Sequence, residues 1–190
     1  MLELWQAKFW EIAKESESAS ALKKAATDGV LSDWTQILTG VVVKTCESMD
    51  WKASARGHKS NLLPVRRSEY LGLDVMAFAD GDKRWRFPTA VIELENSQDI
   101  DSIAYSLWKV LCVRAELRVV FCYCSSPEDR ASLVNRLSRQ VVRALELPVR
   151  AELKGETLVV VGSRAESATF PYGFFKWWRL DSNTGRFRII

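Results

Sequence analysis

Residues 117–124, Leu-Arg-Val-Val-Phe-Cys-Tyr-Cys, constrain the fold of this chain more than any other segment. The run is rich in β-branched and aromatic residues, which favour a β-strand. Its apolar side chains occupy both alternating sets of positions, so both faces of the strand must be covered. Such strands are typical of sheets with parallel strands and helical crossovers. The segment therefore predicts an α/β fold with helices on each side of a sheet.

Helices are predicted before and after this strand. Residues 99–114 place Ile103 and Leu107 on one side of a helix. Ser126-Pro127-Glu128 has the order of cap, proline and acid that begins a helix, which is expected to run to about Leu145. Two earlier helices are predicted over residues 2–14 and 32–47, the second with Ser32 as its N-cap.

The remaining strands are predicted from shorter runs that turn signals separate. Asp80-Gly81 lies between the two clearest runs, which therefore form an antiparallel hairpin. Two more hairpins are expected, around Lys154-Gly155-Glu156 and around Asn183-Thr184-Gly185. The predicted strands are residues 51–56, 69–79, 87–95, 149–153, 157–161, 174–180 and 186–190. A hairpin followed by a helical crossover implies a mixed sheet.

No linker, repeat or low-complexity segment divides the 190 residues, a length that suits one domain. Within it we expect an N-terminal helical extension over residues 1–31. A core over residues 32–124 and a C-terminal α+β appendage over residues 125–190 are expected to follow.

Composition excludes several classes of protein. His58 is the only histidine, which argues against His-rich metal sites and two-histidine catalysis. The net charge of +3 permits nucleic-acid binding without demanding it. No apolar run approaches the roughly 20 residues of a membrane-spanning helix, and the N-terminus lacks a signal-peptide pattern. The four cysteines have no Cys-x-x-Cys spacing. We therefore expect a cytoplasmic protein with reduced cysteines and no membrane association.

The segment Val91-Ile92-Glu93-Leu94-Glu95 carries two carboxylates on one face, because side chains alternate along a strand. Solvent, a basic partner or a cation must offset their repulsion. Asp74 interrupts the apolar strand that pairs with this one, where an unpaired charge is costly. Three converging carboxylates suit a hard divalent cation, which takes oxygen ligands. A Glu-x-Glu pattern alone is also typical of a solvated strand face, so Asp74 is what favours the metal site.

Asp74, a hairpin, Glu93-Leu94-Glu95, a helix and a hydrophobic strand, in this order, resemble the PD-(D/E)xK nuclease superfamily. This superfamily contains restriction endonucleases, repair nucleases and Holliday-junction resolvases, and the resemblance covers about half of the chain. It implies a restriction-endonuclease-like αβββαβ core with a mixed central sheet flanked by helices, here followed by a C-terminal helix and β-hairpins. It also implies hydrolysis of phosphodiester bonds in DNA with Mg²⁺ or Mn²⁺.

The resemblance assigns roles to individual residues. Asp74 corresponds to the first metal-binding acid and Glu93 to the acid of the half-motif, while Leu94 lends its backbone carbonyl to the metal. Glu95 stands where the superfamily most often has lysine, although some active restriction enzymes carry an acid there; it is assigned as a base or a second metal ligand. Lys109, on the following helix, either replaces the missing positive charge or is a surface lysine.

Two groups of residues are candidates for binding nucleic acid. The segment 170–179 interleaves aromatic and basic residues, which is typical of a stacking platform for single strands. We favour instead a hairpin whose rings pack on the core or on a partner subunit, which leaves a homodimer as one option. Basic side chains near the hairpin strands are candidates for contact with DNA phosphates: Lys59, Arg66, Arg67, Lys83 and Arg84.

Three functions remain open from the sequence. The leading one is a Mg²⁺-dependent nuclease that acts on DNA. Glu95 in place of lysine motivates the second, a catalytically inactive nuclease-fold protein that serves as a nucleic-acid-binding or assembly module. The third is an unrelated small-ligand domain, although the glycines are scattered rather than gathered in a phosphate loop. Glu69 is an outside candidate for the acid site, because strand alternation puts it on the face opposite Asp74.

Overall fold

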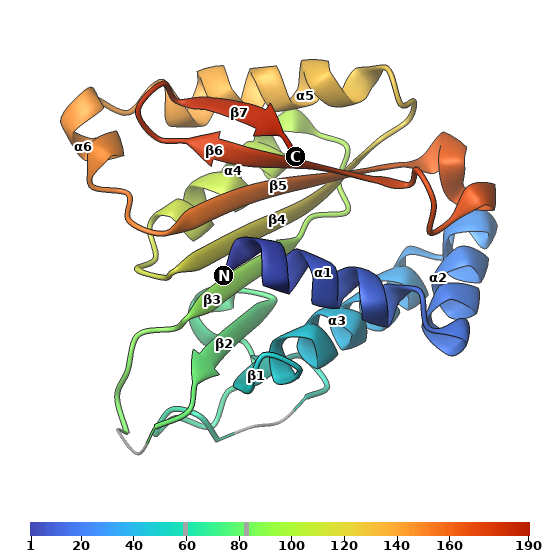
Figure 1. The fold of residues 1–190 in the computed structure, drawn as a ribbon, viewed down its shortest axis with the longest axis horizontal. Coiled ribbons are helices and arrows are strands. Elements are labelled where there is room, and N and C mark those ends of the chain that lie inside the picture. Colours follow the sequence, from blue (N-terminus) through green and yellow to red (C-terminus); the bar gives the residue numbers. More distant parts are fainter. Residues whose placement is uncertain (59–60, 82–83) are drawn as a thin grey trace.

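One mixed sheet organises the molecule (Figure 1). The computed structural model describes residues 1–58, 61–81 and 84–190, and within these residues the sheet has seven strands in the order of the chain, β1-β2-β3-β4-β5-β6-β7. Strands β3, β4 and β5 are parallel, whereas the other neighbouring strands are antiparallel. The strands are β1 Trp51–Ala55, β2 Val75–Ala79, β3 Ala90–Leu94, β4 Leu117–Cys124, β5 Glu156–Ser163, β6 Phe175–Asp181 and β7 Arg186–Ile189.

Helices cover both faces of this sheet, as the apolar strand predicted (Figure 1). On one face lie α1 (Leu2–Ala13), α2 (Ser16–Asp28) and α3 (Leu31–Glu47). On the other lie α4 (Ile100–Leu111), α5 (Asp129–Leu137) and the π-helical turn η2 (Ser138–Val142) that continues α5. The short helix α6 (Leu147–Ala151) and the 3-10 turns η1 (Tyr70–Gly72) and η3 (Arg164–Thr169) complete the described elements.

Strand β4 joins two hydrophobic cores through its alternating side chains. Val119 and Phe121 pack with α1 and α3, whereas Val120 and Cys122 pack with α4 and α5. All eight residues of β4 are buried. The same alternation holds in β3, where Ile92 belongs to the first core and Val91 to the second, so Glu93 faces α4.

The N-terminal region contains one helix that was not predicted and one N-cap at a different residue. Residues 16–28 form α2, which the sequence did not reveal because only Leu22, Ala25 and Ser18 of this polar segment are buried. Gly29 ends α2 in the left-handed conformation, and α3 begins two residues later with Val30 at its N-cap. The predicted cap at Ser32 is therefore wrong, because Ser32 already lies inside the helix and its hydroxyl donates to Asp33.

The predicted strand over residues 69–79 is shorter in the structure. Only Val75–Ala79 forms β2, and Tyr70–Gly72 forms the turn η1. Leu71 has a φ of 57° and Gly72 a φ of 66°, so the chain bends sharply there and Leu71 is left 73% exposed. Asp74 consequently lies between the turn and β2, immediately before Val75, rather than in the middle of a long strand.

The hairpin predicted around Lys154-Gly155-Glu156 is wrong. Residues 147–151 form α6, with Pro148 in its first turn, and β5 pairs in parallel with β4. Gly155 has a φ of 84°, and a Cβ there would overlap the carbonyl groups of Ala115 and Glu116, which allows the chain to pass close to the start of β4. The last three strands therefore extend the sheet instead of forming an appendage. The terminal hairpin of β6 and β7 is confirmed.

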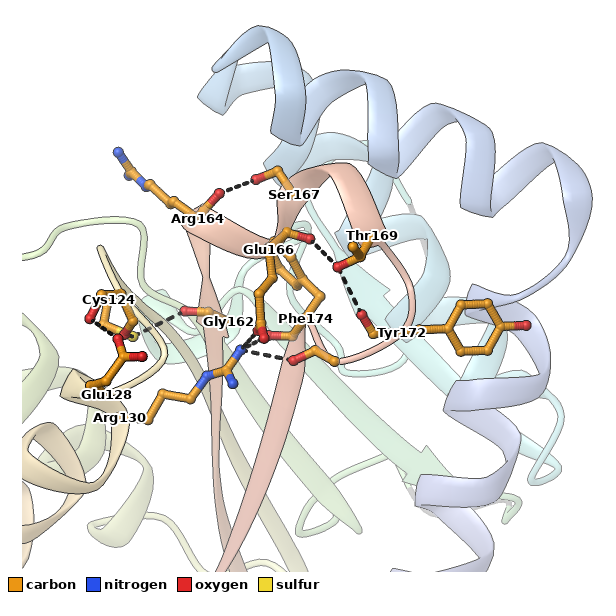
Figure 2. Close-up of polar contacts among 12 residues, drawn as sticks. Cys124, Glu128, Arg130, Gly162, Arg164, Glu166, Ser167, Thr169, Tyr172 and Phe174 are labelled. Atoms are coloured by element: carbon orange, nitrogen blue, oxygen red, sulfur yellow. Dashed lines mark hydrogen bonds and ion pairs between the residues drawn. The ribbon is translucent and has the colours of Figure 1, made fainter.

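The aromatic and basic segment near the C-terminus packs into the core, as we favoured. Phe174, Phe175 and Trp177 are each no more than 3% exposed, whereas Tyr172 is 71% exposed. Figure 2 shows how Arg130 of α5 holds this segment: its Nη2 donates to the carbonyl oxygens of Gly173 at 2.9 Å and Phe174 at 2.7 Å and pairs with Glu166. Among the described helices, none is long and apolar enough to cross a membrane.

Candidate metal centre

Asp74 and Glu93 lie side by side at one end of the inner strands, where β2 begins and β3 ends. Val75 pairs with Ile92 in the antiparallel register of β2 and β3, which brings the preceding and following residues, Asp74 and Glu93, opposite each other. The backbone amide of Asp74 donates to Glu93 Oε1 at 3.3 Å, and the amide of Leu94 donates to Asp74 Oδ2 at 2.7 Å. The predicted juxtaposition of these two acids is thus present in the structure.

The turn η1 places Asp74 in this position. Tyr70 and Leu73 are buried on either side of the bend, and the amide of Leu73 donates to the carbonyl of Tyr70 at 3.1 Å. The bend also brings Glu69 close enough to raise the pKa of Asp74. Strand alternation had placed Glu69 on the opposite face, but Glu69 precedes a turn rather than belonging to the strand.

Lys109 of α4 reaches the same two strands. Its Nζ lies 2.7 Å from Glu93 Oε2 and donates to the carbonyl of Gly72 at 2.8 Å. The ammonium also lies 5.9 Å from the centre of the Tyr105 ring. Asp99 starts α4 by accepting a hydrogen bond from the amide of Ser102 at 3.0 Å, which fixes the beginning of the helix that carries Lys109. Lys109 is therefore part of the acid site.

Burial controls the charge of both acids. It raises the pKa of Glu93 to about 7, although the hydrogen bond from Lys109 opposes this shift, and the nearby Asp74 raises it further. Burial likewise raises the pKa of Asp74, against the opposing effects of the Leu94 amide and Lys109. Near neutral pH the pair thus readily holds a proton, which a cation bound between the carboxylates would displace.

Glu95 lies on the same side of the sheet but has its own partners. Its Oε1 accepts a hydrogen bond from the Ser97 amide at 2.7 Å, and its Oε2 accepts one from the Ser106 hydroxyl at 3.2 Å. Ser106 was not among the predicted site residues. Its position three residues before Lys109 on one helical face is the signal that points to it.

The oxygen atoms at this edge fit a hard cation better than a soft one. Asp74 and Glu93 supply carboxylates, and the Leu94 carbonyl points to the side of its own amide, which is the side of Asp74. Lys109 holds one oxygen of Glu93. Within residues 1–58, 61–81 and 84–190, no group of three His, Cys, Asp or Glu side chains is arranged to hold a metal ion. The convergence of three carboxylates that the sequence predicted is therefore not found among these residues, because Glu95 accepts hydrogen bonds from Ser97 and Ser106 instead.

The basic residues proposed to contact DNA are divided. Arg66 and Arg84 line one hollow of about 300 Å³ together with the segment 61–65. Arg67 follows Arg66 in the sequence and is also exposed. Lys59 and Lys83 lie outside the described residues.

Comparisons with known proteins return no relative for this chain: no family model, no curated protein and no solved structure matches it. The residues of the site are therefore assigned from their own contacts and charges.

Proposed function

We propose that this chain is a Mg²⁺-dependent nuclease that hydrolyses phosphodiester bonds in DNA. In this proposal α3, β1, β2, β3, α4 and β4 form a restriction-endonuclease-like core, whose helix and strand order they share. Asp74 and Glu93 are its metal-binding acids, assisted by the Leu94 carbonyl.

The observation that carries this proposal is the convergence of Asp74, Glu93 and Lys109. Asp74 immediately precedes β2, Glu93 lies in β3 and Lys109 in α4; hydrogen bonds and an ion pair join these residues at one end of the strands. Two acids with raised pKa values beside a lysine are expensive to bury, and clusters of such groups are typical of functional sites.

Each residue then has a distinct task. A bound Mg²⁺ supplies the charge that polarises the phosphodiester group and acidifies a water molecule. Asp74 and Glu93 would hold that ion. Lys109, released from Glu93, would offer its ammonium to the phosphate oxygen on which negative charge develops. Glu95, oriented by Ser97 and Ser106, would accept a proton from the water as its oxygen bonds to phosphorus, while the P–O bond to the leaving sugar oxygen breaks and that oxygen takes a proton from solvent.

Cleavage assays test this proposal directly. The purified chain is incubated with plasmid, single-stranded and branched DNA in Mg²⁺ or Mn²⁺, beside the variants Asp74→Asn and Glu93→Gln. Lys23→Ala, an exposed residue of α2, serves as the matched control. We expect cleavage by the wild-type chain and the control, and none by the two site variants. Cleavage by Asp74→Asn at the wild-type rate would contradict the assignment of Asp74 to the site.

A second candidate is a catalytically inactive module of the same fold. Two contacts favour it: Lys109 already neutralises Glu93, and Glu95 is held by Ser97 and Ser106. In this case the acids and the lysine serve only to fasten α4 to the sheet. The two candidates differ in a melting assay, because only the metal-binding protein gains stability when Mn²⁺ is added.

A further inference from the structure

Four arginines gather at the end of the sheet where β3, β4 and β5 begin, which is opposite the end that carries the acid site. Strand β6 runs antiparallel to β5, pairing Phe175 with Gly162 and Arg179 with Leu158, so the turn after β6 lies where β3, β4 and β5 begin. Asp74 and Glu93 lie where β3 ends. A strand of eight residues spans roughly 25 Å, so this arginine cluster is distinct from the acid site. The cluster consists of Arg139, Arg143, Arg150 and Arg186.

Three of these arginines line a polar hollow. Arg139 and Arg143 of the α5–η2 segment face Arg186 of β7 across a space of about 400 Å³, and Asn135 and Ser138 complete the lining. All three arginines are exposed. The hollow has no apolar side chain in its lining, so it offers nothing to insert into a bilayer or to bury against a hydrophobic partner.

The cluster has no counterion within the part of the chain that the structure describes. None of the four arginines forms an ion pair there, although Arg188 of the same hairpin pairs with Asp181 at 2.8 Å. The Nε atom of Arg150 is buried and has no hydrogen-bond partner. Like charges held together without a counterion repel one another, so an anionic ligand would stabilise this arrangement.

The turn between β6 and β7 packs against two of the arginines, Arg143 and Arg150. Ser138 donates its hydroxyl hydrogen to the carbonyl of Gly185 at 2.6 Å, which fastens the turn to the end of α5. Gly185 has a φ of 67°, and a Cβ there would overlap Arg150 Nη1 and Arg143 Cγ. Gly185 therefore packs closely against these two side chains, and alanine at this positive φ would strain the turn and require Arg150 to shift.

We propose that this cluster binds the phosphate backbone of duplex DNA. Guanidinium groups match phosphate oxygens with paired hydrogen bonds, and the open, polar hollow suits a repeating chain of phosphates. The cluster extends the proposed function to a second DNA contact, but the binding needs neither the metal nor the acids. Failure of the cluster and failure of the nuclease proposal can therefore be told apart.

The test measures binding of a labelled DNA duplex by fluorescence anisotropy in EDTA, over a series of salt concentrations. We expect the variant Arg139→Glu/Arg143→Glu to lose affinity by about tenfold or more. Its plot of log affinity against log salt should be flatter by about 2, since each lost phosphate contact removes about 0.9 from the slope. The control Lys23→Glu/Lys44→Glu makes the same change in net charge at exposed positions of α2 and α3 and should shift affinity far less.

Two more variants separate the alternatives. Gly185→Ala keeps the net charge but displaces Arg143 and Arg150, so it should weaken DNA binding while its melting temperature shows that it remains folded. Lys23→Ala, at an exposed position of α2, should bind DNA as the wild-type chain does. The inference is overturned if the arginine variant and the lysine control weaken binding equally. It is also overturned if phosphatidylserine vesicles bind where DNA does not.

Discussion

Lys109 donates from one ammonium group to Glu93 Oε2 at 2.7 Å and to the Gly72 carbonyl at 2.8 Å. The first acceptor belongs to β3 and the second precedes Asp74 by two residues. A single side chain thus ties α4 to β3 and to the turn η1 that leads to Asp74. A change at Lys109, Glu93 or Asp74 is therefore expected to alter the charge of the other two.

The stability of the protein should fall as the pH rises from about 4.5 to about 7. The pKa of Glu93 is about 7 in the folded chain and 4.5 for an ordinary glutamate, so in this window the folded state binds a proton that the unfolded state has lost. The linkage amounts to at most about 3 kcal/mol. Urea denaturation at several pH values measures it, and Glu93→Gln should remove most of the slope. A slope that is unchanged in this variant would contradict the pKa assignment.

Metal affinity should increase with pH through the same range. Under the proposed function, Mn²⁺ or Mg²⁺ would have to displace the proton that Glu93 holds, so binding should be weaker below the Glu93 pKa of about 7 than above it. At a metal concentration of about 100 times Kd, the stabilisation is about 2.7 kcal/mol. The melting temperature with and without metal, at pH 6 and pH 8, gives the comparison. Asp74→Asn should show no metal-dependent shift at either pH.

Lys109→Met should separate metal binding from catalysis. The ammonium competes with a cation for Glu93 Oε2, so its removal should leave metal affinity equal or higher. Cleavage of DNA should fall by about a hundredfold or more, because a positive group aimed at the phosphate is lost. Lys44→Met, at the exposed end of α3, is the matched control. Parallel loss of metal binding and cleavage would show that Lys109 only supports the fold.

Gly155→Ala should destabilise the protein more than Gly57→Ala. Both glycines have a positive φ, 84° and 81°, so alanine at either position carries a backbone strain of about 1 kcal/mol. At Gly155 the new Cβ also meets the carbonyl groups of Ala115 and Glu116, whereas Gly57 has open space. We expect a total loss of roughly 3 kcal/mol or more for Gly155→Ala in urea denaturation. Equal losses would mean that the connection to β5 can shift away from β4.

The sequence predicted those features that depend on side-chain pattern. The apolar run of β4 and the helix of Ile103 and Leu107 follow from periodicity, and the structure confirms them. The pairing of Asp74 with Glu93 follows from the hairpin between their strands. These elements carry strong local signals, because one face of each must be buried.

Features set by backbone geometry and tertiary contact were not predicted. The bend at Leu71 needs a positive φ at a non-glycine residue, which no sequence rule favours. The segment that became α6 and the start of β5 reads as a hairpin because Gly155 is flanked by polar residues. Only the close approach of Gly155 to Ala115 and Glu116 reveals a crossover. Similarly, the hydrogen bond from Ser106 to Glu95 depends on how α4 packs on the sheet.

The order of the seven strands bears on how the protein folds. Each strand pairs with the one that precedes it in the chain, so no strand has to be inserted between two others that already pair. The longest of these connections, between β4 and β5, contains α5, η2 and α6, and the entropic cost of closing a loop grows only slowly with its length. The sheet can therefore grow by adding one strand at a time as the chain leaves the ribosome, and folding should be fast for a protein with parallel strands.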